Sequence, residues 1–178
     1  MISIIVGTNR KESKSTIVAH KISELLRSAG QKSQILELKD LPSEMLHESM
    51  YTSDNQHTII SQYQDKYISP VQKFIFVVPE YNGSFPGVLK LFIDAVSVRH
   101  YKTNFSGKTA FLVGIASGRL GNAIGLDHLA YVLNYVGAST FPQRLYIPAI
   151  DAKVKDTEFQ HEGDIGVLTQ MLNEFVNY

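Results

Sequence analysis

Hydroxyl and basic side chains gather between Gly7 and Thr16, where the chain reads GTNRKESKST. This stretch follows a short β-branched run and precedes a segment with apolar residues at helical spacing, so it should open a helix. Free backbone N–H groups and the positive end of the helix dipole make such a place a site for anions. A phosphate monoester is the ligand that its side chains favour. The side chains that add donors are those of Thr8, Arg10, Ser13, Ser15 and Thr16.

The spacing of this stretch excludes two common phosphate-binding loops. It has no Gly-Lys-Ser/Thr sequence, which a Walker loop needs, and it has too few glycines for a dinucleotide-binding fingerprint. Taken alone, it is better explained by hydroxyls that cap a helix beside solvated cations. The phosphate hypothesis therefore depends on what lies beside this stretch in the fold.

A second polar stretch, Pro79 to Ser84 (PEYNGS), separates an apolar strand-like run from a helix-like one. Gly83 suits a sharp turn, while Tyr81 and Asn82 expose a ring and an amide beside exposed peptide groups. These groups suit a flat heteroaromatic ligand with donors and acceptors on its edge. The alternative is a plain strand-to-helix turn in which Tyr81 packs on its neighbours.

A third stretch, Ala116 to Asn122 (ASGRLGN), again joins a strand-like run to a helix-like one. Small residues at 116–118, followed by Arg119 and Gly121, would let a flat ring approach the backbone closely. An ordinary glycine-containing turn is the commoner explanation when this stretch is considered alone.

Strand-like and helix-like runs alternate along the chain, which predicts a parallel sheet with helices on both faces. We expect an α/β, three-layer, flavodoxin-like fold with a five-stranded parallel sheet of order 2-1-3-4-5, formed by a single domain over residues 1–178. The expected strands are 2–6, 33–38, 73–78, 109–116 and 139–147, the last broken by Pro142. The expected helices are 15–29, 55–67, 86–97, 121–136 and 164–178, the first capped by Ser15 or Thr16.

In this strand order the first, third and fourth strands are neighbours. Ligands of open parallel sheets bind beyond the carboxyl ends of the strands, so the three polar stretches should border one crevice. Residues 148–163 form the one long polar connection, which we expect to lie on the surface, and residues 148–178 show no functional signal.

The composition narrows the class of function. Lys plus Arg and Asp plus Glu number 17 each, so no excess of charge points to a nucleic acid or an anionic membrane as partner. The chain has no cysteine, which excludes disulfides and thiolate nucleophiles, and with them the low-molecular-weight phosphatases that share this fold. The apolar runs are shorter than a membrane helix needs, and Met1 begins a strand-like run instead of a signal peptide. We therefore expect a cytoplasmic protein.

Together the three stretches resemble the NADPH-dependent FMN reductase family, which includes quinone, chromate and azo-dye reductases. The family's second loop reads P-E-Y-N-x-S-x-P-G-x-L-K-N-x-I-D, and PEYNGSFPGVLKLFID matches it everywhere except at Leu91, which replaces the usual Asn. Its first loop reads G-S-x-R-x-x-S, where Thr8 replaces Ser and keeps the hydroxyl. Its fourth strand and third loop resemble FSGKTAFLVGIASGRLGN. The resemblance covers Met1 to about Ile147.

The resemblance implies an FMN cofactor that takes hydride from NADPH or NADH and passes electrons to a small-molecule acceptor, such as a quinone, a flavin, an azo compound or a metal oxyanion. It also implies a homodimer or homotetramer. Because the flavin would carry the chemistry, no catalytic side chain and no metal ligand is expected. The residues implied to hold the phosphate are Thr8, Arg10, Ser13, Ser15 and Thr16. Those implied to border the isoalloxazine ring are Pro79, Glu80, Tyr81, Asn82 and Gly83 on one side and Ser117, Gly118 and Arg119 on the other.

Two other functions remain open at this point. A flavodoxin-type electron carrier would be expected to be strongly acidic, whereas this chain has a formal net charge of zero. A non-catalytic flavin-binding sensor would share the same loops. Steady turnover with NADPH separates a reductase from both alternatives.

Overall fold

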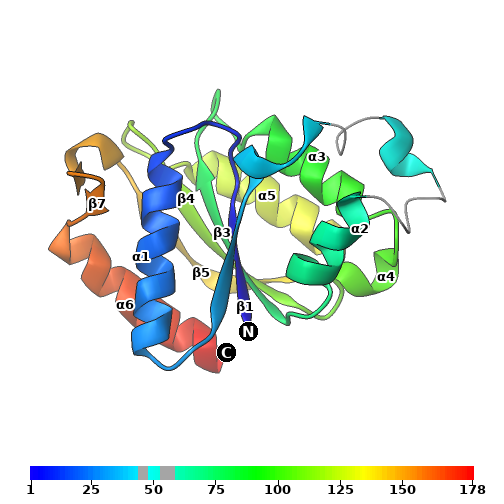
Figure 1. The fold of residues 1–178 in the computed structure, drawn as a ribbon. Helices are drawn as coiled ribbons and strands as arrows, with labels where there is room; N and C mark the ends of the chain where they lie inside the picture. Colours follow the sequence, from blue (N-terminus) through cyan, green and yellow to red (C-terminus); the bar gives the residue numbers. More distant parts are fainter. Residues whose placement is uncertain (44–47, 53–58) are drawn as a thin grey trace.

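A computed structural model of the chain describes residues 1–43, 48–52 and 59–178 (Figure 1). Its centre is a five-stranded sheet of order β2-β1-β3-β4-β5, in which every neighbouring pair of strands is parallel. The predicted α/β fold and its strand order are confirmed. The strands are β1 (Ile2–Val6), β2 (Ser33–Glu37), β3 (Lys73–Pro79), β4 (Thr109–Ile115) and β5 (Ser139–Ile147).

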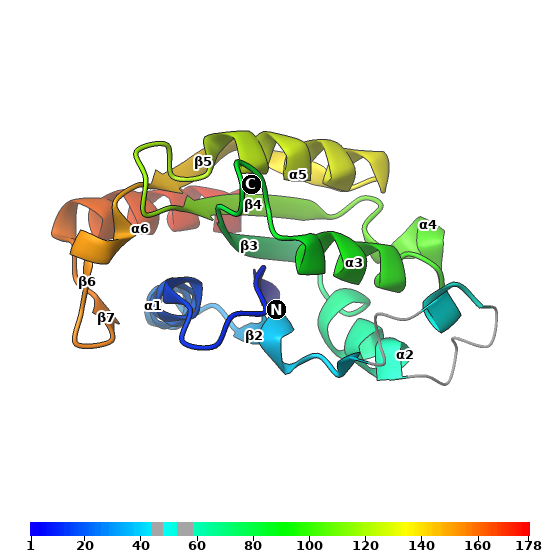
Figure 2. The ribbon, with the colours of Figure 1, turned by 90° about the horizontal axis from the view of Figure 1, so that it is seen from above.

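Helices cover both faces of the sheet and produce the predicted three layers (Figures 1 and 2). One face carries α1 and α6, and the other carries α2, α3 and α5 with the short α4 beside them. No helix in the described ranges has the length and apolar character needed to cross a membrane. The helices are α1 (Lys14–Ser28), α2 (Ile59–Tyr63), α3 (Gly87–Val96), α4 (Tyr101–Asn104), α5 (Ala123–Tyr135) and α6 (Glu162–Asn177).

Strand β3 supplies side chains to two separate apolar cores, because successive side chains of a strand point to opposite faces. Phe74 and Phe76 pack into the core beneath α3 and α5. Ile75 and Val77 pack into the core beneath α1 and α6. Burial on both faces explains why this strand reads as a continuous apolar run instead of alternating with polar residues.

The last strand of the sheet accommodates the proline that was expected to break it. Ala110 pairs with Thr140 and Leu112 pairs with Arg144, so β5 carries two extra residues opposite β4 around Pro142. Strand β5 lies at the edge of the sheet, where the missing N–H of proline is tolerated. The strand therefore bends at Pro142 and continues to Ile147.

Two sequence-based expectations about helices need correction. The cap of α1 is Ser13, not Ser15 or Thr16, and its hydroxyl accepts a hydrogen bond from the backbone N–H of Ser15. The helix predicted over 55–67 lies partly outside the described residues. From residue 59 it forms α2, which continues as the π-helical turn η5 (Gln64–Ile68).

The long connection before α6 is more structured than its polar sequence suggested. It forms the short helix η6 (Ile150–Ala152) and a two-stranded antiparallel ladder, β6 (Val154–Lys155) with β7 (Glu158–Phe159). Ile150 and Phe159 are buried in the core beneath α1 and α6. These two apolar anchors hold the connection against the body of the protein, beside the carboxyl edge of the sheet.

Candidate functional site

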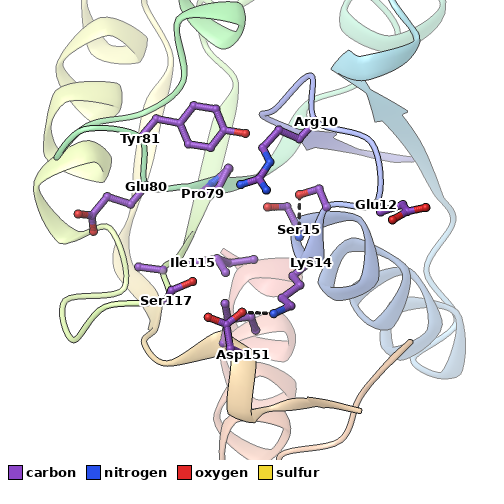
Figure 3. A pocket seen from close by; sticks show the side chains of 13 residues that line it. Arg10, Glu12, Lys14, Ser15, Pro79, Glu80, Tyr81, Ile115, Ser117 and Asp151 are labelled. Carbon is purple, nitrogen blue, oxygen red and sulfur yellow. Dashed lines mark hydrogen bonds and ion pairs between the residues drawn. The ribbon is translucent and has the colours of Figure 1, made fainter. Parts of the chain in front are cut away.

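A pocket of about 210 Å³ opens beyond the carboxyl ends of β1, β3 and β4 (Figure 3). Three loops border it: the first loop (7–13), the second loop (80–86) and the third loop (116–122). The three polar stretches therefore come together around one pocket, as predicted. The lining residues are Arg10, Glu12, Ser13, Lys14, Ser15, Pro79, Glu80, Tyr81, Ile115, Ala116, Ser117, Ile150 and Asp151.

The N-terminus of α1 supplies part of the lining of this pocket. Ser13 adopts extended dihedral angles, and its Oγ accepts from Ser15 N at 3.2 Å. The hydroxyl of Ser15 is buried, and it has no hydrogen-bond partner among the described residues. A buried hydroxyl without a partner is unfavourable. An oxyanion bound at the helix N-terminus would satisfy it, so a phosphate group fits the residues that are present.

The charged side chains of the pocket are not arranged as a simple cationic cluster. The guanidinium of Arg10 is turned into the pocket (Figure 3). Lys14, the first residue of α1, forms an ion pair with Asp151 of η6 across the pocket wall. The carboxylates of Glu12 and Glu80 point away from the centre. Arg10 is therefore the cation best placed to meet an anionic ligand.

A hydrogen bond joins the first loop to the second. Thr8 Oγ1 lies 2.6 Å from the hydroxyl of Tyr81 and also accepts from Arg10 N at 3.2 Å. Thr8 itself is buried and does not line the pocket. Its hydroxyl therefore fixes the backbone of Arg10 and the ring of Tyr81 relative to each other.

The tip of the second loop is a tight two-residue turn. Tyr81 N donates to Ser84 O at 2.9 Å, and Ser84 N donates to Tyr81 O at 3.0 Å. Between them Asn82 and Gly83 both adopt positive φ angles, of 51° and 75°. This is the backbone of a type I′ turn, for which Asn-Gly is the preferred sequence. The turn requirement accounts for both residues, and both lie at the exposed tip, outside the pocket.

Asn122, at the end of the third loop, clamps the end of β3. Its side-chain amide donates to Val78 O at 3.2 Å and to Pro79 O at 3.0 Å. A Cβ on Gly125 would lie 2.7 Å from the carbonyl carbon of Ser84, so only glycine lets the second loop pack this closely on α5. Sequence reasoning missed this clamp, because an Asn before a helix normally indicates nothing more than a cap.

Seven of the predicted cofactor-binding residues line the pocket, and six do not. The seven are Arg10, Ser13, Ser15, Pro79, Glu80, Tyr81 and Ser117. Those placed elsewhere are Thr8, Thr16, Asn82, Gly83, Gly118 and Arg119.

Thr16 was expected beside the phosphate but faces the neighbouring strand. Its Oγ1 donates to Glu37 Oε2 at 2.7 Å, at the end of β2. Burial opposes ionisation of Glu37, but hydrogen bonds from Lys39 and Thr16 outweigh it, so the pKa of Glu37 lies below its ordinary value of 4.5. Thr16 thus links α1 to β2 and supplies no donor to the pocket.

The polar connection supplies a wall of the pocket that the sequence did not reveal. Ala149 N donates to Gly118 O at 3.0 Å, and Ile150 N donates to Ala116 O at 3.1 Å. These bonds bring Ile150 and Asp151 to the pocket. Two residues of the region 148–178, which showed no functional signal in the sequence, therefore line the pocket. A single Asp in a polar segment has no signature that separates it from a solvated surface residue.

Comparison with known proteins shows a family to which the chain is similar. Residues 1–151 match the family model described as NADPH-dependent FMN reductase. The chain is 32% identical over 130 residues to a quinone reductase of Pseudomonas putida strain KT2440, an alignment covering 71% of this chain and 65% of that protein. It is 28% identical over 154 residues to a 2-hydroxy-1,4-benzoquinone reductase of a Burkholderia species, covering 86% and 81% of the two chains. The chain thus spans just under two thirds of the first of these relatives.

Solved structures show the same fold. The NAD(P)H:(acceptor) oxidoreductase FerB of Paracoccus denitrificans superposes with a TM-score of 0.80 at 23% identity, covering 99% of this chain and 95% of that one. A flavodoxin of Streptococcus pneumoniae superposes with a TM-score of 0.61 at 16% identity, covering 99% and 97%. The likeness to a flavodoxin supports the predicted flavodoxin-like fold.

Proposed function

Because the chain belongs to the NADPH-dependent FMN reductase family, we propose that it is an NAD(P)H-dependent oxidoreductase that uses FMN to reduce a small acceptor. Quinones are the acceptor class that we favour, since two relatives are quinone reductases. The observation that carries the proposal is the buried, unpartnered hydroxyl of Ser15 at the N-terminus of α1, inside a pocket built by the three loops. Free flavin, azo compounds and metal oxyanions are the other acceptors to be tested.

The residues of the first loop and of α1 would hold the phosphate of FMN. Ser15 and Ser13 offer hydroxyl donors, α1 offers the positive end of its helix dipole, and Arg10 offers a forked cationic donor. The pocket volume of about 210 Å³ is below the roughly 300–1,000 Å³ of sites that enclose a whole ligand. We therefore assign the pocket to the phosphate-bearing end and place the ring at its open edge.

Residues of the second and third loops would border the ring. Pro79, Glu80 and Tyr81 lie at one side of the pocket, and Ser117 lies at another. Asn82, Gly83, Gly118 and Arg119 stand outside the pocket, where they would form the rim around an open ring site. FMN, when bound, supplies hydride acceptance from NAD(P)H and electron donation to the acceptor. The chain's own residues bind it, orient it and leave one side open to the two substrates.

We further propose that the protein forms a homodimer or homotetramer through the outer face of α5. Large apolar side chains are exposed along this face, at Ile124, Tyr131 and Tyr135, and Leu120 of the third loop is exposed just before the helix. Beside them a groove of about 550 Å³ between α3 and α5 is lined by further tyrosines and by the Lys90–Asp94 ion pair. A second copy related by a twofold axis could pair the same apolar stripe with itself. Light scattering of the wild-type protein and of Tyr131→Glu should distinguish an assembly that depends on this face from a monomer.

A binding titration followed by a turnover assay tests the proposed function. FMN fluorescence is followed on addition of the protein, and NADPH oxidation is then measured with FMN and a benzoquinone present, with FMN-free reactions as the control. Saturable binding with FMN-dependent quinone reduction supports the proposal. Binding without steady turnover would indicate a carrier or sensor. If FMN does not bind, the assignment of the pocket is wrong.

A further inference from the structure

The wall of the pocket carries a carboxylate, that of Asp151. A carboxylate is unexpected beside an anionic ligand, because the two negative charges repel each other. Asp151 and Lys14 reach toward each other across this wall and form an ion pair (Figure 3). With side-chain exposures of 56% and 38% the pair is partly screened by solvent. It is therefore weak enough to respond to a charged ligand.

The position of Asp151 is fixed by the fold, not by the ion pair alone. The backbone N–H groups of Ala149 and Ile150 donate to the third loop, and the side chain of Ile150 is 3% exposed in the core. Ala149 adopts a positive φ of 49° where the chain turns into η6. Asp151 thus sits on a short helix that is pinned to the third loop, and its carboxylate stays at the pocket.

The charges around the pocket do not suit tight binding of a dianion. Two cationic and three anionic side chains line it, and of the carboxylates those of Glu12 and Glu80 point away from its centre. Lys14 is committed to Asp151. Within the described part of the chain Arg10 makes no ion pair, so it is the one lining cation that is free for a phosphate.

We propose that Asp151 sets the affinity of the pocket for the phosphate of FMN, by holding the ammonium of Lys14 and by repelling the phosphate. The inference rests on the proposed function and adds to it that the flavin exchanges readily instead of being held tightly. Riboflavin has the same ring and ribityl chain without the phosphate. Asp151 should therefore affect the binding of FMN and leave the binding of riboflavin unchanged.

The test is a set of equilibrium titrations by flavin fluorescence, at low salt, with FMN and riboflavin. Asp151→Asn removes the repulsion and frees Lys14, so FMN should bind about tenfold more tightly while riboflavin affinity stays the same. Adding Lys14→Met to Asp151→Asn should reverse much of that gain, because the freed ammonium is then absent. Asp127→Asn is the matched control, since it removes one carboxylate from an exposed ion pair with Arg144 outside the pocket, and it should change neither affinity.

The outcomes separate the two proposals. If Asp151→Asn leaves FMN affinity unchanged, weakens it, or tightens FMN and riboflavin equally, the role of Asp151 is overturned while the proposed function stands. If the wild-type protein and Asp151→Asn both fail to bind either flavin, the proposed function itself falls and takes this inference with it. A phosphate-specific gain that shrinks as salt rises would support the electrostatic role.

Discussion

The hydroxyl of Tyr81 lies 2.6 Å from Thr8 Oγ1, and this hydrogen bond joins the loop after β3 to the loop after β1. The two residues are separated by 73 positions in the sequence. Thr8 is buried beneath the loop and fixes the backbone of Arg10, while Tyr81 forms part of the pocket wall. The arrangement of the proposed phosphate site therefore depends on a contact between two loops and not only on the helix that carries it.

Replacing Tyr81 with Phe removes that contact and keeps the ring. We expect the free energy of unfolding to fall by about 1 kcal/mol, since one hydrogen bond to a buried hydroxyl is lost. FMN affinity should fall several-fold, because the first loop loses its tie to the second. Urea unfolding and a fluorescence titration measure the two effects. Tyr146→Phe, on the edge strand β5, is the control, and a Tyr81→Phe protein that matches it in both assays would contradict the role given to this bond.

Replacing Ser15 with Ala separates binding from stability. The hydroxyl of Ser15 has no partner among the described residues, so its removal should leave the ligand-free protein as stable as the wild type or slightly more stable. FMN affinity should fall by about tenfold if this hydroxyl donates to the phosphate. Thermal unfolding of the ligand-free protein measures its stability, and a flavin titration measures its affinity for FMN. Ser23→Ala, on the same helix and away from the pocket, should leave FMN affinity unchanged; a loss of stability with no loss of affinity in Ser15→Ala would refute this assignment.

Two substitutions of Asn122 separate the stability that its side-chain hydrogen bonds contribute from the effect of its left-handed backbone conformation. Asn122→Gly keeps the positive φ of 66° accessible but leaves the carbonyls of Val78 and Pro79 without their donor, which should cost about 1–2 kcal/mol of stability. Asn122→Ala adds the strain of a Cβ in the left-handed region and should cost about 1 kcal/mol more. Urea unfolding of the two variants gives both differences. Wild-type stability in Asn122→Gly would mean that the clamp contributes nothing.

The stabilising effect of Glu37 should depend on pH in a defined direction. Its pKa in the folded protein is lowered by hydrogen bonds from Lys39 and Thr16, which outweigh the opposing effect of burial. The ionised carboxylate therefore stabilises the fold above its ordinary pKa of 4.5, and this contribution is lost as the pH falls through the lowered folded-state value. Compared with Glu37→Gln, the wild type should be more stable by about 1 kcal/mol at neutral pH. Unfolding curves between neutral and acid pH should show that advantage disappear in acid; an advantage that persists there would argue against ionisation as its source.

The sheet and the three loops could be predicted from the sequence because their signals are local and repeated. Apolar β-branched runs such as Ile2–Val6 alternate with helical spacing, and this alternation admits few topologies. The cap of α1 could not be assigned in the same way. Ser13, Ser15 and Thr16 are all competent caps, and the choice among them depends on where the chain leaves the sheet.

The remaining parts of the site depend on contacts between distant segments. The roles of Asn122 and Asp151 arise from the carbonyls and cations that the fold brings beside them. Asn122 ends the third polar stretch, but that pattern does not reveal its clamp, and Asp151 belongs to no recognisable pattern. Asn82 and Gly83 have, by contrast, a structural role that is local. The sequence suggested a sharp turn at Gly83 and a contact with a ligand for Asn82, and the type I′ turn that they form accounts for both residue types.

The ion pair that closes the pocket, between Lys14 and Asp151, joins residues 137 positions apart. Closing so large a loop costs entropy that contacts between the intervening strands offset, so we expect this ion pair to form after those strands have paired. During refolding, the effect of Asp151 on FMN binding should therefore appear late, with the final docking of η6. A nascent chain that has emerged only as far as β5 would hold the five strands of the sheet and none of this wall, so the weakening of FMN binding by Asp151 reports when η6 has docked.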